Sequence, residues 1–208
     1  MTLAAILDII LHLNLYVGIL LDRYHHYAYL ILMLIIFCET GLVITPFLPG
    51  DSLVFAAGLA FSNTHRPIST LITLLIIAAV LGDNCNYGIG RCFGRKLFKR
   101  FPRIFKPDYL AKTELFYAKH GPTAIILARF IPMLRTFIPF FAGLSRMRYA
   151  LYLFFSIMSA SLWICVLGLS SYYFGHLTFI QEHFSIVILL IIIASLIPTI
   201  FAFIKNKW

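Results

Sequence analysis

Four apolar runs of bilayer-spanning length restrict this chain to a membrane-embedded fold. They cover residues 27–45, 68–87, 149–174 and 184–204, and about 20 apolar residues are needed to cross the hydrocarbon core. Only 12% of the 208 residues are charged, roughly half the share found in soluble domains. The sequence therefore predicts an all-helical integral membrane protein with one membrane domain over 1–208, and no length left for a soluble catalytic domain.

Two segments combine charged residues and prolines inside apolar sequence, where a plain membrane helix has neither. The first begins with Glu39 and ends with Asp51, and the second contains Arg129 and Arg135. An ionised group costs about 2.5–3.5 kcal/mol at the bilayer centre, so such groups usually pair and usually mark a transport pathway. We therefore interpret the two acids and the two arginines as one candidate site.

The distribution of basic residues predicts the topology. Nine of the 17 Lys and Arg residues lie in the segment 91–120, which the positive-inside rule places in the cytoplasm against anionic headgroups. Nucleic-acid binding is a poorer interpretation of this loop. If 121–143 crossed the bilayer, Arg146 and Arg148 would lie outside, which breaks the rule. We therefore expect 121–143 to be a re-entrant hairpin that enters and leaves on the cytoplasmic side, with Pro132 and Pro139 at its turn.

The same reasoning predicts a second hairpin that opens outward. Residues 27–61 end in a leg that is too short to span, and 68–90 then crosses to the cytoplasm. Spanning helices over 149–174 and 184–204 leave the C-terminus cytoplasmic. The predicted fold is two inverted re-entrant hairpins plus spanning helices, as in inverted-repeat transporters that bind substrate at the midplane. Residues 1–26 form either an interfacial or a spanning helix.

At these motifs the chain resembles the DedA family of bacterial membrane proteins, whose shared region is also called the SNARE-associated or VTT domain. The matching motifs are Glu39-Thr-Gly, Pro46-Phe-Leu-Pro-Gly-Asp51, Gly82-Asp83-Asn84-Cys-Asn86-Tyr87-Gly-Ile-Gly90-Arg91, Arg129-Phe-Ile-Pro132-Met-Leu-Arg135-Thr136 and Ala142-Gly143. The resemblance implies two opposed re-entrant loops in a multi-pass protein of the bacterial inner membrane. It also implies movement of lipids or ions, with recycling of undecaprenyl phosphate in several members and dependence on the proton motive force in some.

The resemblance also implies which residues matter, because the important acidic pair of the family falls on Glu39 and Asp51, and its arginine pair on Arg129 and Arg135. A guanidinium stays charged when buried and suits a phosphate bidentately. Burial and a nearby arginine have opposite effects on the pKa of a carboxyl, so a carboxyl subject to both can gain and lose a proton. The expected function is a flippase for undecaprenyl phosphate, with the arginines as substrate ligands and the acids as proton-coupling groups.

Three further polar residues stand near the inner end of 68–90. Asp83 and Asn86 share one helical face, and Arg91 follows them. They either line the cavity or stabilise the helix end, and the sequence leaves both open. It also leaves open whether the four charged residues only lock the hairpins together, and whether the protein is a homo-oligomer.

Other functions compete with a proton-coupled flippase. An uncoupled phospholipid scramblase and a proton-coupled ion antiporter use the same site, and an interaction scaffold would use 91–120. A lipid phosphatase needs a nucleophile or base beside the arginines, and the nearest histidine is His120, outside both hairpins. The four cysteines are dispersed, which argues against a metal site. We therefore expect neither an enzyme nor a cofactor.

Overall fold

The computed structural model describes residues 13–24, 26–42, 50–62, 64, 67–100, 121–129, 132–175, 177, 186–187 and 190. Its elements are α2 (Leu13–Tyr24), α3 (His26–Gly41), α4 (Gly50–Ser62), α5 (Ile68–Arg100), the 3-10 helix η1 (Gly121–Thr123), α7 (Ala124–Arg129), α8 (Pro132–Leu144) and α9 (Tyr149–Phe174). No strand occurs in these ranges, which confirms the all-helical class.

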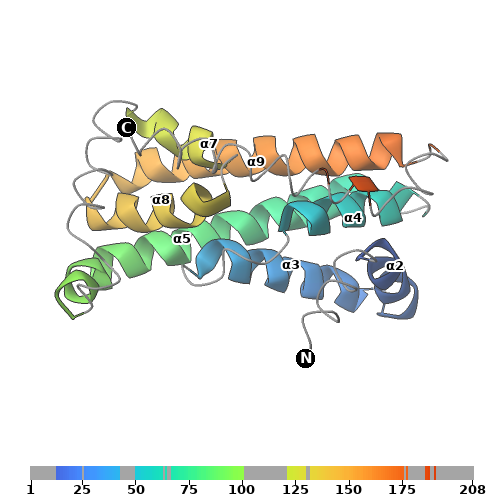
Figure 1. Cartoon of the computed structure of the whole chain (residues 1–208), viewed down its shortest axis with the longest axis horizontal. Coiled ribbons are helices and arrows are strands. Elements are labelled where there is room, and N and C mark those ends of the chain that lie inside the picture. Colours follow the sequence, from blue (N-terminus) through green and yellow to red (C-terminus); the bar gives the residue numbers. More distant parts are fainter. Residues whose placement is uncertain are drawn as a thin grey trace.

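Two long antiparallel helices form the spine of the molecule. Figure 1 shows α5 and α9 running along the long axis in opposite directions. Ile68–Gly94 of α5 and the whole of α9 are long and apolar enough to cross a membrane. The α9 helix covers the residues for which the sequence predicts a span, 149–174. The predicted span 184–204 lies outside the described residues, apart from 186–187 and 190.

Helix α5 is longer than the predicted span. We expected it to end at residue 90, before a basic loop over 91–120, but it continues to Arg100. The added residues are mostly Arg, Lys and Leu, which favour helix, and no proline occurs before Pro102. Part of the basic segment is therefore helical, and residues 101–120 lie outside the described part of the chain.

Shorter helices fill the space beside the spine and meet at its middle. Helices α4 and α8 have 13 residues each and α3 has 16, so each is too short to cross about 30 Å alone at 1.5 Å per residue. Figure 1 shows α4 and α8 reaching the middle from opposite ends of the molecule. The turns of the two predicted hairpins, 43–49 and 130–131, lie outside the described residues, so the re-entrant arrangement stays a prediction.

Glycines let the short helices approach the backbone of α5 closely. A Cβ atom on Gly82 would lie 2.0 Å from Thr40 Oγ1 of α3, and one on Gly90 would lie 2.0 Å from the Phe140 carbonyl oxygen of α8. Both distances are far below van der Waals contact, so any side chain would push the helices apart. The segment of α5 between these glycines is thereby held against α3 and α8.

Pro139 does not lie at a turn, contrary to the sequence prediction. It lies inside α8, whereas Pro132 begins that helix, a position where a missing N–H costs nothing. A proline inside a helix leaves carbonyls in the preceding turn without their usual donors, and neighbouring groups must satisfy them. The carbonyl whose helical donor Pro139 removes is that of Arg135, four residues earlier, and the next carbonyl, that of Thr136, accepts a hydrogen bond from Asn86 Nδ2 of α5 at 2.7 Å.

Candidate functional site

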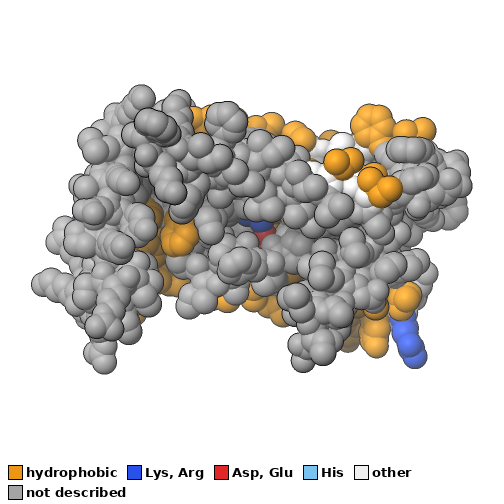
Figure 2. Space-filling view, viewed as in Figure 1, with side chains coloured by type: hydrophobic (Ala, Val, Ile, Leu, Met, Phe, Trp, Pro, Cys, Tyr) orange, Lys and Arg blue, Asp and Glu red, His pale blue; other side chains and the backbone are white. Residues whose placement is uncertain are grey.

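The inner ends of the short helices carry the four charged residues that the sequence singles out. Glu39 lies near the end of α3 and Asp51 in the first turn of α4, while Arg129 ends α7 and Arg135 lies in the first turn of α8. All but Asp51 are buried, and the Asp51 side chain is 19% exposed. The structure thus brings them together at the middle of the molecule, where Figure 2 shows basic and acidic atoms within a hollow.

Arg135 is held between the two predicted acids. Its Nη2 donates to Glu39 Oε1, and its Nη1 donates to Asp51 Oδ1 at 2.6 Å. These ion pairs join helix α8 to both α3 and α4. One guanidinium therefore fastens the acid-bearing half of the molecule to the arginine-bearing half.

Glu39 also caps helix α4. The backbone N–H of Gly50 donates to Glu39 Oε1 at 3.2 Å, which places a carboxylate at the positive end of the helix dipole. A Cβ atom at position 50 would lie 1.6 Å from Glu39 Oε2. Only glycine lets the carboxylate approach this closely, so Gly50 of the first motif has a local structural cause.

Arg129 pairs with neither of the two predicted acids. Its Nη1 donates to Oδ2 of Asp83 on α5, and Ser156 Oγ of α9 donates to the same oxygen at 2.8 Å. The hydroxyl of Tyr152 donates to the backbone oxygen of Asp83 at 2.7 Å. Asp83 is 1% exposed and is a third acid of the network. The sequence had left open whether it lines the cavity or stabilises the helix end.

Asn86 lies one turn further along α5 and bridges two short helices. Its Nδ2 donates to the carbonyls of Thr40, at 3.1 Å, and Thr136, at 2.7 Å. These threonines directly follow Glu39 and Arg135 in the sequence. The Asn86 amide therefore fixes the height along α5 at which the Glu39 and Arg135 side chains meet. This is a positioning role rather than a helix cap.

Arg91 lies apart from this network. Its side chain is exposed and its Nη1 donates to the hydroxyl of Tyr87 at 3.3 Å. That hydroxyl in turn donates to the carbonyl of Met147 at 2.7 Å. Tyr87 therefore ties α5 to the turn between α8 and α9, and Arg91 only donates to Tyr87 on the same helix, away from Asp83 and Asn86.

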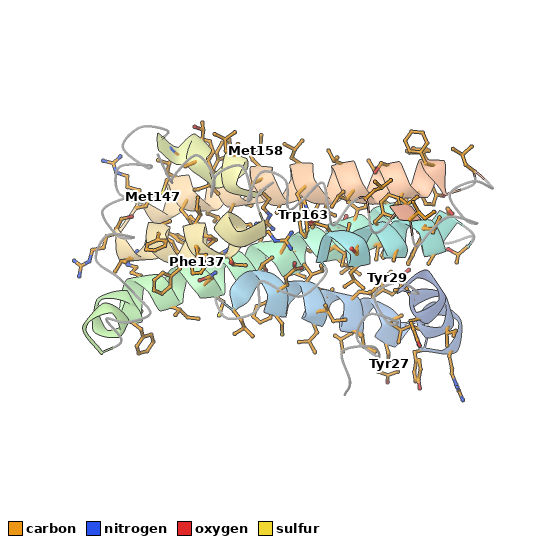
Figure 3. All side chains as sticks on the ribbon, viewed as in Figure 1. Tyr27, Tyr29, Phe137, Met147, Met158 and Trp163 are labelled. Atoms are coloured by element: carbon orange, nitrogen blue, oxygen red, sulfur yellow. The ribbon has the colours of Figure 1, made fainter. Side chains whose placement is uncertain are left out.

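Trp163 of α9 belongs to the site, and the sequence analysis missed it. Its Nε1 donates to Asp51 Oδ1 at 2.9 Å. The guanidinium carbons of Arg129 and Arg135 lie 5.0 Å and 5.1 Å from its ring centroid. Figure 3 shows its labelled side chain near the middle of the molecule. The available signal was a stripe of Ser156, Ser159 and Trp163 at helical spacing within an otherwise apolar run.

Several buried polar atoms of the network have no hydrogen-bond partner among the described residues. These atoms are Nε and Nη2 of Arg129, Nε of Arg135, Oε2 of Glu39 and Oδ1 of Asp83. Such groups are rare inside proteins and call for an explanation. Three carboxylates also face two guanidiniums, so one negative charge is unbalanced when all five groups are ionised. The unpaired donors suit an anion, and the surplus carboxylate suits a proton.

Comparison with known proteins identifies the family. A model of the VTT domain matches residues 48–173. The chain belongs to the DedA family of membrane proteins. The matched range contains Asp51, Asp83, both arginines and Trp163, whereas Glu39 precedes it.

The relatives are bacterial membrane proteins of similar length. Protein DedA of Escherichia coli K12 is 43% identical over 205 residues, which cover 97% of this chain and 94% of that protein. An uncharacterised membrane protein of Mycobacterium tuberculosis H37Rv is 40% identical over 172 residues, covering 81% and 75%. The inner membrane protein YqjA of Escherichia coli K12 is 34% identical over 148 residues, covering 71% and 67%. No solved structure matches the chain.

Proposed function

We propose that this DedA-family protein is a flippase that moves a lipid phosphate, in the first place undecaprenyl phosphate, across the bacterial inner membrane with proton coupling. The observation that carries the proposal is the pair of buried arginines, which have N–H donors without a partner among the described residues, where helix ends from both sides of the molecule meet. Buried ionisable groups in a membrane domain usually mark a transport pathway. The headgroup would bind there while its tail stays in lipid.

Arg129 is the better phosphate ligand of the two. It holds Asp83 through Nη1 alone, and both Nε and Nη2 lack a partner among the described residues. These two groups form one edge of the guanidinium fork, and two parallel N–H donors match two phosphate oxygens. A phosphate can therefore bind Arg129 without breaking its pair with Asp83.

Arg135 has the opposite arrangement and suits a role in coupling. Both of its terminal nitrogens are engaged, with Glu39 and Asp51. A proton on either carboxyl weakens its pair with Arg135, which lets the guanidinium turn to the phosphate. Loss of that proton on the other side restores the pair and expels the phosphate. Because three carboxylates face two guanidiniums, the network favours proton coupling over an uncoupled scramblase.

A flipping assay in proteoliposomes tests the proposal. We expect undecaprenyl phosphate to flip faster than ordinary phospholipids, and faster still with a pH gradient. Arg129→Ala combined with Arg135→Ala should abolish flipping in protein that stays monodisperse. The matched control is Arg148→Ala, which removes an exposed arginine outside the network.

Each contrary result points to a competing function. Flipping that survives the double substitution rules out the arginine site. Equal rates with and without the gradient indicate a scramblase, and cation exchange without lipid movement indicates an antiporter. Release of inorganic phosphate from the lipid indicates a phosphatase, in which case Ser156 beside Asp83 is the first nucleophile to test.

A further inference from the structure

Trp163 contacts both arginines and one of the acids. It is 3% exposed and comes from α9, whereas the charged residues come from α3, α4, α5, α7 and α8. Its ring is within cation–π range of both guanidiniums. Its N–H reaches Asp51. A buried tryptophan usually finds a partner for its N–H, so the contact of one ring with two guanidiniums is the feature that distinguishes Trp163 from a packing residue.

The N–H of Trp163 and the guanidinium of Arg135 share one acceptor. Arg135 Nη1 donates to Asp51 Oδ1 at 2.6 Å, and Trp163 Nε1 donates to the same oxygen at 2.9 Å. When a phosphate replaces Asp51 on Arg135, the carboxylate keeps the indole donor. A hydrogen bond to a charged group stabilises more than one between neutral groups, so the indole reduces the cost of separating Asp51 from Arg135.

The ring of Trp163 acts on the arginines themselves. Two guanidiniums that lie near one binding point repel each other, and a shared aromatic ring offers each of them attraction to its π face. The ring remains when Arg135 changes partner from carboxylate to phosphate. It therefore holds the two cations at a constant spacing through the exchange.

We propose that Trp163 is a positioning residue for the phosphate headgroup, whose ring spaces the two arginines and whose N–H retains Asp51 while the phosphate occupies Arg135. This inference rests on the proposed lipid-phosphate flippase. It adds a residue with no charge of its own, and it assigns separate roles to two parts of one side chain. Two substitutions can therefore separate these roles.

The test measures flipping rate against the mole fraction of undecaprenyl phosphate in proteoliposomes. Trp163→Phe keeps a ring and loses the N–H, and we expect the apparent KM to rise about tenfold. Trp163→Leu loses both, and the apparent KM should rise about a hundredfold. Phe61→Leu is the matched control, because Phe61 is a fully buried aromatic residue at the outer end of α4. It should lower thermal stability and leave the apparent KM unchanged.

A purely structural role predicts a different outcome. Both Trp163 variants would then lower the amount of folded protein, as Phe61→Leu does, while the folded fraction keeps the apparent KM of the parent protein. That result would overturn the inference and leave the flippase intact. If the unsubstituted protein does not flip the lipid, the proposed function itself has failed.

Tryptophan fluorescence supplies a second measurement that does not depend on substituting Trp163. The chain has two tryptophans, Trp163 and Trp208, so Trp208→Phe leaves one reporter at the site. We expect undecaprenyl phosphate to change its emission in a saturable way, because the charges beside the indole rearrange. The change should vanish when Arg129→Ala is added. Emission that stays constant while the same variant flips the lipid would contradict the inference.

Discussion

The acid-bearing pair of helices, α3 and α4, and the arginine-bearing pair, α7 and α8, differ in how their charges are held. Both acids of the first pair engage a single arginine of the second, Arg135. The other arginine, Arg129, pairs instead with Asp83 on the spine helix α5. Among the described charged residues, the ion pairs between the two helix pairs all run through Arg135, while one edge of the Arg129 guanidinium has no hydrogen-bond partner there. The comparison indicates different roles for the two arginines. Arg135 controls the contact between the two pairs of helices, and Arg129 binds the anion.

Lysine substitutions at positions 129 and 135 test most directly whether the two arginines have different roles. Arg129→Lys keeps the charge but loses the two parallel donors, so we expect apparent affinity for undecaprenyl phosphate to fall by about tenfold to a hundredfold. Arg135→Lys keeps a cation between two carboxylates and should lower the maximal rate more than the affinity. Flipping kinetics at varied lipid fraction distinguish the two effects. Equal changes in both variants would show that the arginines are equivalent.

Asp83→Asn tests the same difference by changing the acid that pairs with Arg129. It retains the shape of the side chain and removes the negative charge beside Arg129. We expect the phosphate to bind several-fold more tightly and leave more slowly, with a lower maximal rate. Asp51→Asn instead loosens Arg135 and should change the dependence on the pH gradient. A weaker affinity in Asp83→Asn would mean that Asp83 only positions Arg129.

Asn86→Leu tests whether the Asn86 amide fixes the position of α3 relative to α8. The substitution removes two hydrogen bonds to buried carbonyls, which corresponds to about 1–3 kcal/mol. Thermal unfolding in detergent should show the loss. Asn84→Leu is the control, because Asn84 Nδ2 donates only within its own helix, to the Val80 carbonyl at 2.7 Å. A similar loss in both variants would remove the special role of Asn86.

Cysteine labelling tests the opposed orientation of the halves without changing activity. In a background without the native cysteines, single cysteines replace Asn63 and Ser145, which follow the outer ends of α4 and α8 in the chain. The predicted topology places Asn63 outside and Ser145 in the cytoplasm. An impermeant reagent added to intact cells should label position 63 alone. Labelling of both positions, or of 145 alone, would contradict the opposed hairpins.

The sequence was sufficient for the helical class. It also singled out four charged residues, through ionised groups in apolar runs and the family resemblance, and the structure places them side by side, while their functional roles stay predictions. It could not predict which acid pairs with which arginine. That pairing depends on how closely α3 and α8 approach α5, which Gly82 and Gly90 control. The sequence therefore left open whether Asp83 lines the cavity or stabilises the helix end, whereas the structure pairs it with Arg129.

Trp163 and Pro139 show a second kind of limit. A tryptophan in an apolar helix is usually a packing residue, and only contact with two guanidiniums from other helices reveals another role. Proline usually marks a turn, but inside α8 a donor from another helix satisfies a carbonyl in the turn before it. In both cases the deciding partner is distant in the chain, so the local pattern does not identify it.

The most direct test of the central claim is the flipping of undecaprenyl phosphate by the unsubstituted protein and by Arg129→Lys, in proteoliposomes with an imposed pH gradient. The account predicts rapid, gradient-dependent flipping by the first and a strongly raised lipid requirement in the second. No flipping by the unsubstituted protein, or indistinguishable kinetics in the two, would contradict it.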